Sequence, residues 1–69
     1  MSNMNQDETD AINARLYELD QFCDYIVNEI DVAIARENHE KKSLLEMQHK
    51  EAMSEIKQLM QQLKSTENQ

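Results

Sequence analysis

The sequence has no glycine, no proline and no tryptophan, and it has one cysteine. Without glycine the chain lacks the tight backbone loops that cradle phosphate groups or form oxyanion holes. A single cysteine excludes an internal disulfide, and with two histidines it falls short of a structural zinc site. No apolar run reaches the roughly 18 residues of a membrane span, and the amino-terminal MSNMNQDETD does not resemble a signal peptide. We therefore expect a cytoplasmic protein without a cofactor.

Basic residues are also scarce. The chain has 14 acidic and 7 basic residues, and its net charge of −7 disfavours direct binding to nucleic acid or anionic membranes. Eight acids and one base lie in residues 1–35, whereas residues 36–69 contain six of each. This asymmetry favours the pairing of unlike helices. As an alternative, an acidic chain could mimic DNA and antagonise a nucleic-acid-binding protein.

Two apolar stripes with alternating spacings of three and four residues predict two amphipathic helices. The stripes are out of phase, and the displacement between them matches neither a stutter nor a stammer, so the chain is expected to break between them. Each stripe is wide, because Val27 and Ile34 flank the first and Met53 and Met60 flank the second. The first stripe contains Ile12, Leu16, Leu19, Cys23, Ile26, Ile30 and Ala33, and the second contains Leu45, His49, Ala52, Ile56, Leu59 and Leu63.

The polar residues 36–43 between the stripes are interpreted as a turn. Asn38 is the expected left-handed residue that ends the first helix, with Arg36 in its last turn, and Ser43 with Glu46 forms a capping box for the second. These signals place the helices at about residues 8–37 and 43–65, the turn near 38–42, and frayed ends at about 1–7 and 66–69.

The predicted fold is therefore all-α: one domain, residues 1–69, folded as an antiparallel two-helix hairpin. So short a chain has difficulty burying a sufficient core alone, and a homodimer forming a four-helix bundle would cover both wide stripes. The stripe residues, apart from Ala33, are the expected oligomer core. The alternative is one continuous helix in a dimeric coiled coil, which would have to place Glu37 and Glu40 at or near its interface.

Few residues of the sequence suggest a catalytic or metal-binding role. Glu46 and His49 have the Glu-x-x-His spacing of di-metal carboxylate bundles, but the first helix offers no facing glutamate before Glu37. His49 within an apolar stripe is better interpreted as a register device or a pH-sensitive residue. Cys23 has no neighbouring base in the sequence and reads as a small core residue. We expect no enzymatic activity, and a di-metal bundle is the least favoured alternative.

The sequence favours binding over catalysis. Phe22, Tyr25 and Val32, bordered by Glu18 and Glu29, are apolar or acidic positions outside the first stripe. Either they face another helix of the bundle, or they form a partner-docking surface with an acidic border. The predicted function is a small regulatory or adaptor protein that forms a homodimer and binds one other protein. A secretion-type co-chaperone that binds an amphipathic helix is a further alternative.

Overall fold

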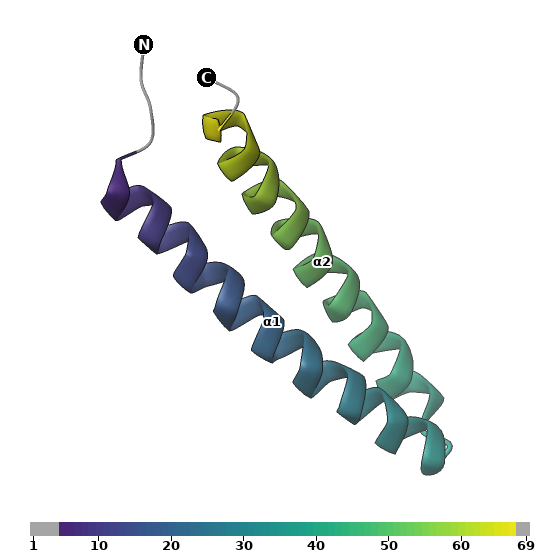
Figure 1. The fold of residues 1–69 in the computed structure, drawn as a ribbon. Coiled ribbons are helices and arrows are strands. Elements are labelled where there is room, and N and C mark those ends of the chain that lie inside the picture. The colour runs from purple at the N-terminus through teal and green to yellow at the C-terminus, as the bar shows by residue number, and fades with distance from the viewer. Residues whose placement is uncertain (1–4, 68–69) are drawn as a thin grey trace.

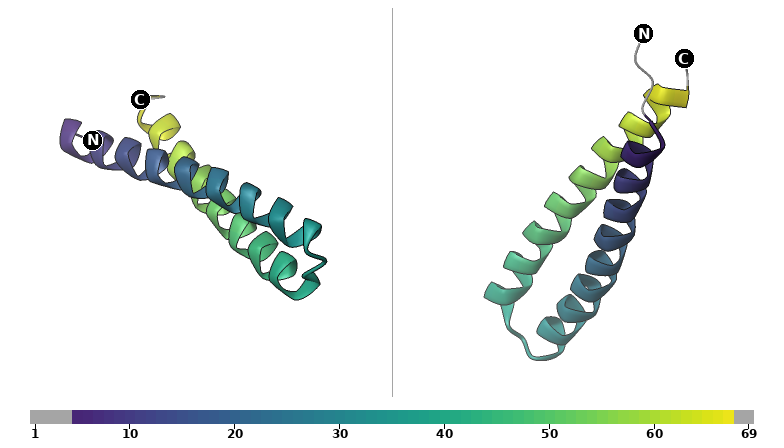
Figure 2. Two further views of the ribbon diagram at one scale, coloured as in Figure 1. Left: turned by 90° about the horizontal axis from the view of Figure 1, so that it is seen from below. Right: turned by 90° about the vertical axis from the view of Figure 1, so that its left-hand side faces the viewer.

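The computed structural model describes residues 5–67 and has two helices. Helix α1 spans Gln6–Ala35 and helix α2 spans His39–Glu67. The helices run antiparallel, so the start of α1 and the end of α2 lie at the same end of the molecule (Figure 1). The views of Figure 1 and Figure 2 together show that the helices coil around each other. The predicted all-α hairpin is confirmed, and the alternative of one continuous helix is wrong.

Asn5 caps the amino-terminal end of α1. The Glu8 backbone N–H donates to Asn5 Oδ1 at 2.8 Å, which satisfies one of the free N–H groups of the first turn. Asp7 and Glu8 lie in that turn, where their charge favours the positive end of the helix dipole. Helix α1 therefore begins two residues earlier than predicted, and α2 extends two residues beyond its predicted end at residue 65. The expected fraying of residues 1–4 and 68–69 lies outside the described residues.

The carboxyl end of α1 closes in a Schellman motif. The Asn38 N–H donates to the Ala33 carbonyl at 2.8 Å and the Glu37 N–H donates to the Ile34 carbonyl at 3.0 Å. Glu37, with φ 56°, is the residue in the left-handed region. This bond pattern requires the left-handed residue directly after the cap residue Arg36. The prediction that Asn38 takes the left-handed conformation was therefore wrong by one position.

Asn38 instead opens α2. Its Oδ1 accepts a hydrogen bond from the Lys41 N–H at 3.1 Å, and its carbonyl accepts one from the Lys42 N–H at 3.0 Å. Helix α2 thus starts at His39, four residues before the predicted start, and the turn is shorter than residues 38–42. Ser43 lies inside the helix, so the predicted capping box with Glu46 does not open it. Asparagine has the stronger cap preference, and its position is fixed by the end of α1.

Two clusters of buried side chains join the helices. Nearer the turn, Ile26, Ala33 and Leu45 are buried, with Ile30 packed against them. Nearer the chain ends, Leu19, Cys23 and Ala52 are buried, with Ile56 and Leu59 packed against them. These residues come from the two predicted stripes, which face each other within one chain. The molecule is an elongated pair of helices, 53 × 15 × 12 Å.

Neither described helix contains an apolar segment that could cross a membrane. The most apolar positions recur at helical spacing and alternate with charged residues, which is typical of an amphipathic helix.

Candidate interaction surfaces

The structure places most of the predicted oligomer-core residues between the two helices of one chain. Five of them are buried: Leu19, Cys23, Ile26, Leu45 and Ala52. The others are half-buried: Ile12, Leu16, Ile30, His49, Ile56, Leu59 and Leu63. A half-buried apolar side chain on a two-helix core keeps surface that a further helix could cover. Their role in an oligomer core stays a prediction.

The first candidate surface lies along one side of α1 and consists of Phe22, Tyr25 and Val32, bordered by Glu18 and Glu29. We call it the aromatic surface. Tyr25 is 59% exposed, and Phe22 and Val32 are 41% exposed. Glu18 is exposed and Glu29 is half-buried. Spacings of three, four and seven residues keep these side chains on one side of the helix. The hairpin therefore leaves these three apolar side chains accessible.

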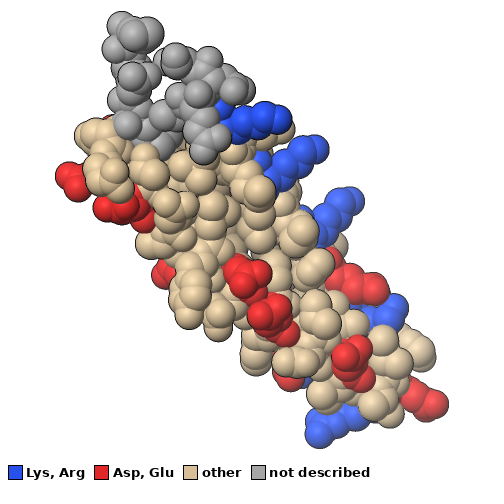
Figure 3. All heavy atoms as spheres, viewed as in Figure 1, with Lys and Arg blue, Asp and Glu red and all other residues tan. Residues whose placement is uncertain are grey.

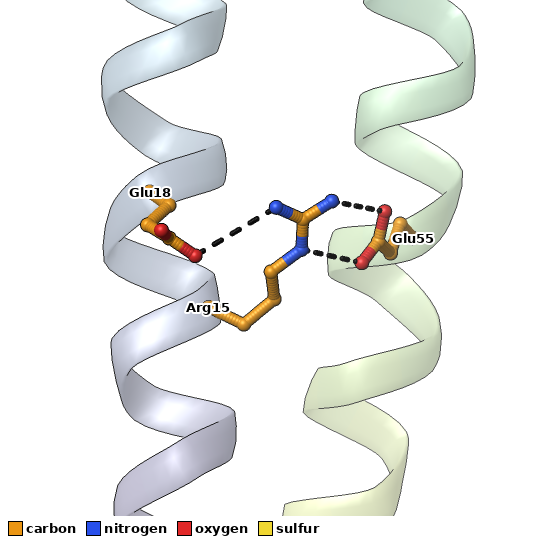
Figure 4. Close-up of polar contacts among 3 residues, drawn as sticks. All are labelled: Arg15, Glu18 and Glu55. Carbon is orange, nitrogen blue, oxygen red and sulfur yellow. Dashed lines mark hydrogen bonds and ion pairs between the residues drawn. The ribbon is translucent and has the colours of Figure 1, made fainter.

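Arg15 links the two helices beside the aromatic surface. Its Nε donates to Glu55 Oε2 at 2.8 Å and its Nη2 donates to Glu55 Oε1 at 3.1 Å (Figure 4). The two hydrogen bonds form a bidentate ion pair between α1 and α2. Its Nη1 also lies 3.7 Å from Glu18 Oε1. The hydrogen bond from Arg15 lowers the pKa of Glu55, and the same bond raises the pKa of Arg15. Both side chains face solvent, so the pair aligns the helices more than it stabilises them.

Further acidic groups adjoin this pair. A shallow depression between the helices is lined by Arg15, Phe22 and Ala52 together with the carboxylates of Glu18, Glu51 and Glu55. With Glu29 farther along α1, this side of the hairpin combines an aromatic ring and several carboxylates with Arg15, which is already paired. Its charge favours a cationic ligand.

The second candidate surface lies on the opposite side of the hairpin. Asp20 and Phe22 are two residues apart, which is about 200° of helix rotation, so they point to opposite sides of α1. Here the two helices form a groove of about 810 Å³, which we call the methionine groove. Its lining residues are Leu16 and Asp20 from α1, and Met53, Ile56, Lys57, Met60, Gln61, Leu63 and Lys64 from α2.

Met53 and Met60 form the most exposed apolar part of this groove, at 47% and 57% exposure. Val27 and Ile34 continue the apolar side chains towards the turn, since they follow Asp20 at intervals of seven residues, and they are 47% and 53% exposed. An apolar strip therefore runs along most of this side of the hairpin. Unbranched methionine side chains adapt to varied shapes, which suits a surface that packs against another helix.

The edges of the methionine groove have opposite charges. Asp24 and Asp31 lie on the α1 edge at a spacing of seven residues, near Asp20, and Lys50, Lys57 and Lys64 lie on the α2 edge at the same spacing. Figure 3 shows basic side chains along the outer edge of the carboxyl-terminal half of α2, and acidic side chains over α1. Part of the charge asymmetry of the sequence, namely Asp20, Asp24 and Asp31 on α1 and the three lysines on α2, is thus an asymmetry between the two edges of one surface.

The residues considered for chemistry lie apart from one another. Cys23 is a buried free thiol, and its burial, reinforced by Asp20 and Asp24, raises its pKa and so lowers its nucleophilicity. Glu46 is exposed and pairs with Lys42 at 3.2 Å, while His49 is half-buried. Within the described part of the chain, no three His, Cys, Asp or Glu side chains gather where they could hold a metal ion.

Sequence reasoning found the aromatic surface but missed two features of the hairpin. It identified Met53 and Met60 as flanking the second stripe, but did not join them to Leu16 and Asp20 in one groove. It also missed the Arg15–Glu55 ion pair. Both features join residues about 40 positions apart, and their proximity depends on how the turn aligns the helices. The signals available were the exposed methionines and a lone arginine in an acidic segment.

Comparisons of the chain with protein-family models, with curated proteins and with solved structures found no match.

Proposed function

We propose that this chain is a non-catalytic protein-interaction protein of the cytoplasm that acts as a homodimer and binds one other protein through its aromatic surface. One observation carries the proposal. Phe22, Tyr25 and Val32 stay exposed on a hairpin whose core is formed without them. Aromatic side chains grouped within an acidic border are typical of the centre of a binding surface.

The chemistry of this surface indicates the kind of partner. Tyr25 and Phe22 offer flat apolar area, while Glu18, Glu29 and Glu51 carry negative charge nearby. A helix or extended segment that presents one or two apolar side chains flanked by lysine or arginine would complement both properties. Arg15 is held by Glu55, so it adds little free positive charge to repel such a segment.

The test is affinity capture from the native host, followed by mass spectrometry, with the wild-type chain and a Tyr25→Ser/Val32→Ser variant. We expect wild type to retain one predominant protein at a fixed stoichiometry, and the variant to lose at least about tenfold in affinity, because removing central apolar contacts costs more than about 1.4 kcal/mol. Circular dichroism should show unchanged helix content, since both positions are exposed.

Tyr17→Ser is the matched control. Tyr17 is 67% exposed, and the rotation from Phe22 places it on the opposite side of α1. Equal capture by the two serine variants would contradict the proposal. Loss of the captured protein on addition of DNA, together with a steep dependence on salt, would also contradict it and would indicate an acidic antagonist of a nucleic-acid-binding protein instead.

A further inference from the structure

The methionine groove and the strip that continues it form a long unpartnered face of the hairpin. The exposed apolar residues on this face come from both helices and extend from Met60 near the chain ends to Ile34 near the turn. The molecule is 53 Å long and 15 Å wide, so a strip along one broad side gives two hairpins a contact that runs along most of their length. Such lengthwise contacts between helices build four-helix bundles.

The charges on this face are complementary to themselves. Asp20, Asp24 and Asp31 border the apolar strip on α1, and Lys50, Lys57 and Lys64 border it on α2. When two such faces meet about a twofold axis parallel to the long axis of the hairpin, α1 of each copy lies over α2 of the other. Each acidic edge then meets a basic edge. A twofold axis across the hairpin would place α1 over α1 and set like charges against each other, which is unfavourable.

The opposite face does not have this property. Around the aromatic surface, Glu18, Glu29, Glu51 and Glu55 outnumber Arg15, so two copies meeting there would bring carboxylates together. The two faces of the hairpin therefore differ in the partner that their charge favours. One suits a cationic ligand and the other suits a copy of itself.

We propose that a second copy of this chain docks on the methionine groove, with α1 of one copy over α2 of the other and both turns at the same end. This inference rests on the homodimer in the proposed function and assigns its face and geometry. The result is an antiparallel four-helix bundle in which Val27, Ile34, Met53 and Met60 become core residues.

The positions of the charged residues along the long axis of the hairpin, here called their levels, define which of them meet in the dimer. Arg15 lies opposite Glu55 in the hairpin, and the helices run antiparallel, so Lys50, five residues before Glu55, lies level with Asp20 and about one helical turn from Asp24. Rotation about a twofold axis parallel to the long axis of the hairpin leaves the level of each residue unchanged. Lys50 of each copy therefore lies near Asp20 and Asp24 of the other copy, and this contact occurs twice in the dimer.

Sedimentation velocity of the full chain tests the docking face. We expect wild type to sediment as a dimer at tens of micromolar, and a Val27→Lys/Met53→Lys variant to sediment as a helical monomer with a dissociation constant raised at least about a hundredfold, because it places four charges per dimer in an apolar interface. Tyr25→Lys on the aromatic surface is the matched control and should remain dimeric. A monomeric wild type, or a dimeric Val27→Lys/Met53→Lys variant, would overturn the inference.

Charge exchange tests the proposed geometry. Lys50→Glu alone and Asp20→Lys/Asp24→Lys alone should each weaken the dimer about tenfold at low salt, and combining all three in one chain should restore most of the affinity. Failure of the combined variant to recover would contradict the contact. A merely structural effect of these exposed positions would show no such recovery.

Spin labels at Glu40→Cys in a Cys23→Ala chain then decide the relative direction of the hairpins. Turns at the same end should give an inter-copy distance below about 30 Å, whereas opposed turns would separate the labels by about 40 Å or more, the length of a 30-residue helix. The second result would overturn the arrangement. Capture through the aromatic surface is measured separately, so a failed dimer and a failed partner interaction are distinguishable.

Discussion

The half of the hairpin near the turn and the half near the chain ends differ in how completely one helix covers the other. Near the turn, Ile26 is 1% exposed and packs with Ala33 and Leu45, a large side chain against a small one. Near the chain ends, Leu19, Cys23 and Ala52 are buried, but Ile56 and Leu59 are only partly covered, and the methionine groove lies beside them. The core between the helices is therefore most completely buried around Ile26 near the turn, whereas Ile56 and Leu59 near the chain ends keep part of their surface exposed.

This difference concerns how well the single chain buries each part of its core. Burial of apolar area is the main source of stability, and Ile56 and Leu59 are less completely buried than Ile26. We therefore expect truncation of a core side chain near the turn to cost more stability than truncation near the chain ends. A second copy on the methionine groove would cover residues of both halves, from Ile34 to Met60, so the stability of the whole hairpin should depend on protein concentration.

The largest expected effect is a difference in the free energy of unfolding between core substitutions in the two halves. Ile26→Ala should lower the free energy of unfolding by about 2 to 5 kcal/mol, because it leaves a cavity where surrounding residues are fully packed. Leu59→Ala should cost about 1 to 2 kcal/mol, because Leu59 is only partly buried. Urea denaturation of both variants measures the difference, with Ile26→Val as a milder variant that keeps the chain folded. If both substitutions lowered the free energy of unfolding equally at low protein concentration, the two halves would not differ in how well their cores are packed.

The next effect concerns the end of the turn half. Asn38→Ala should destabilise the hairpin by about 1 kcal/mol, because the Lys41 N–H loses its acceptor at the start of α2. Ser43→Ala is the control, since Ser43 lies inside the helix, and it should have almost no effect. Thermal unfolding followed by circular dichroism provides the measurement. A larger loss of stability in Ser43→Ala than in Asn38→Ala would indicate that Ser43 caps α2.

A smaller change of opposite sign is expected one residue earlier. Glu37 occupies the left-handed region at φ 56°, where a residue with a β-carbon is strained and glycine is not. Glu37→Gly should raise the free energy of unfolding by up to about 1 kcal/mol, although glycine also gains freedom in the unfolded chain. The control is Glu40→Gly inside α2, which should destabilise the helix by about 1 kcal/mol. Destabilisation by both variants would argue against the Schellman motif.

The smallest effect concerns the ion pair near the chain ends. The hydrogen bond from Arg15 lowers the pKa of Glu55 in the folded chain, so the pair contributes stability above the ordinary glutamate pKa and loses it as the pH falls through the lowered value. Wild type should therefore be slightly more stable than Glu55→Gln at pH 7, and this advantage should disappear once the pH has fallen below the lowered pKa of Glu55. Glu51→Gln is the control. A difference that grows on acidification would contradict the proposed role of the pair.

The sequence predicted the hairpin because its two stripes have helical spacing and cannot share one continuous face. It also predicted the residues that meet between the helices, including Leu19, Ile26 and Leu45. The turn was less predictable. Asn38 suited both a left-handed position and a helix cap. The hydrogen bonds that the Ala33 and Ile34 carbonyls accept, together with the φ of Glu37, show that Glu37 takes the first role. The conformational preferences of single residues did not determine which residue takes the strained left-handed conformation.

The candidate surfaces divide in the same way. Phe22, Tyr25 and Val32 could be singled out because they share one side of a helix and lie outside its apolar stripe. The methionine groove required knowledge of which α2 residues lie beside Leu16 and Asp20, and that depends on the alignment of the two helices. The spacing of Lys50, Lys57 and Lys64 was visible in the sequence, but their position across the groove from the acidic edge of α1 was not.

By itself the sequence determined that this chain forms two amphipathic helices, because periodic apolar residues and the absence of glycine and proline leave few other ways to bury apolar surface. It also determined the excess of acid in the first helix. The tertiary structure decided which residue bends the chain, which side chains face across the helices and which are left outside. Those outcomes depend on contacts between residues far apart in the chain, which local patterns do not specify.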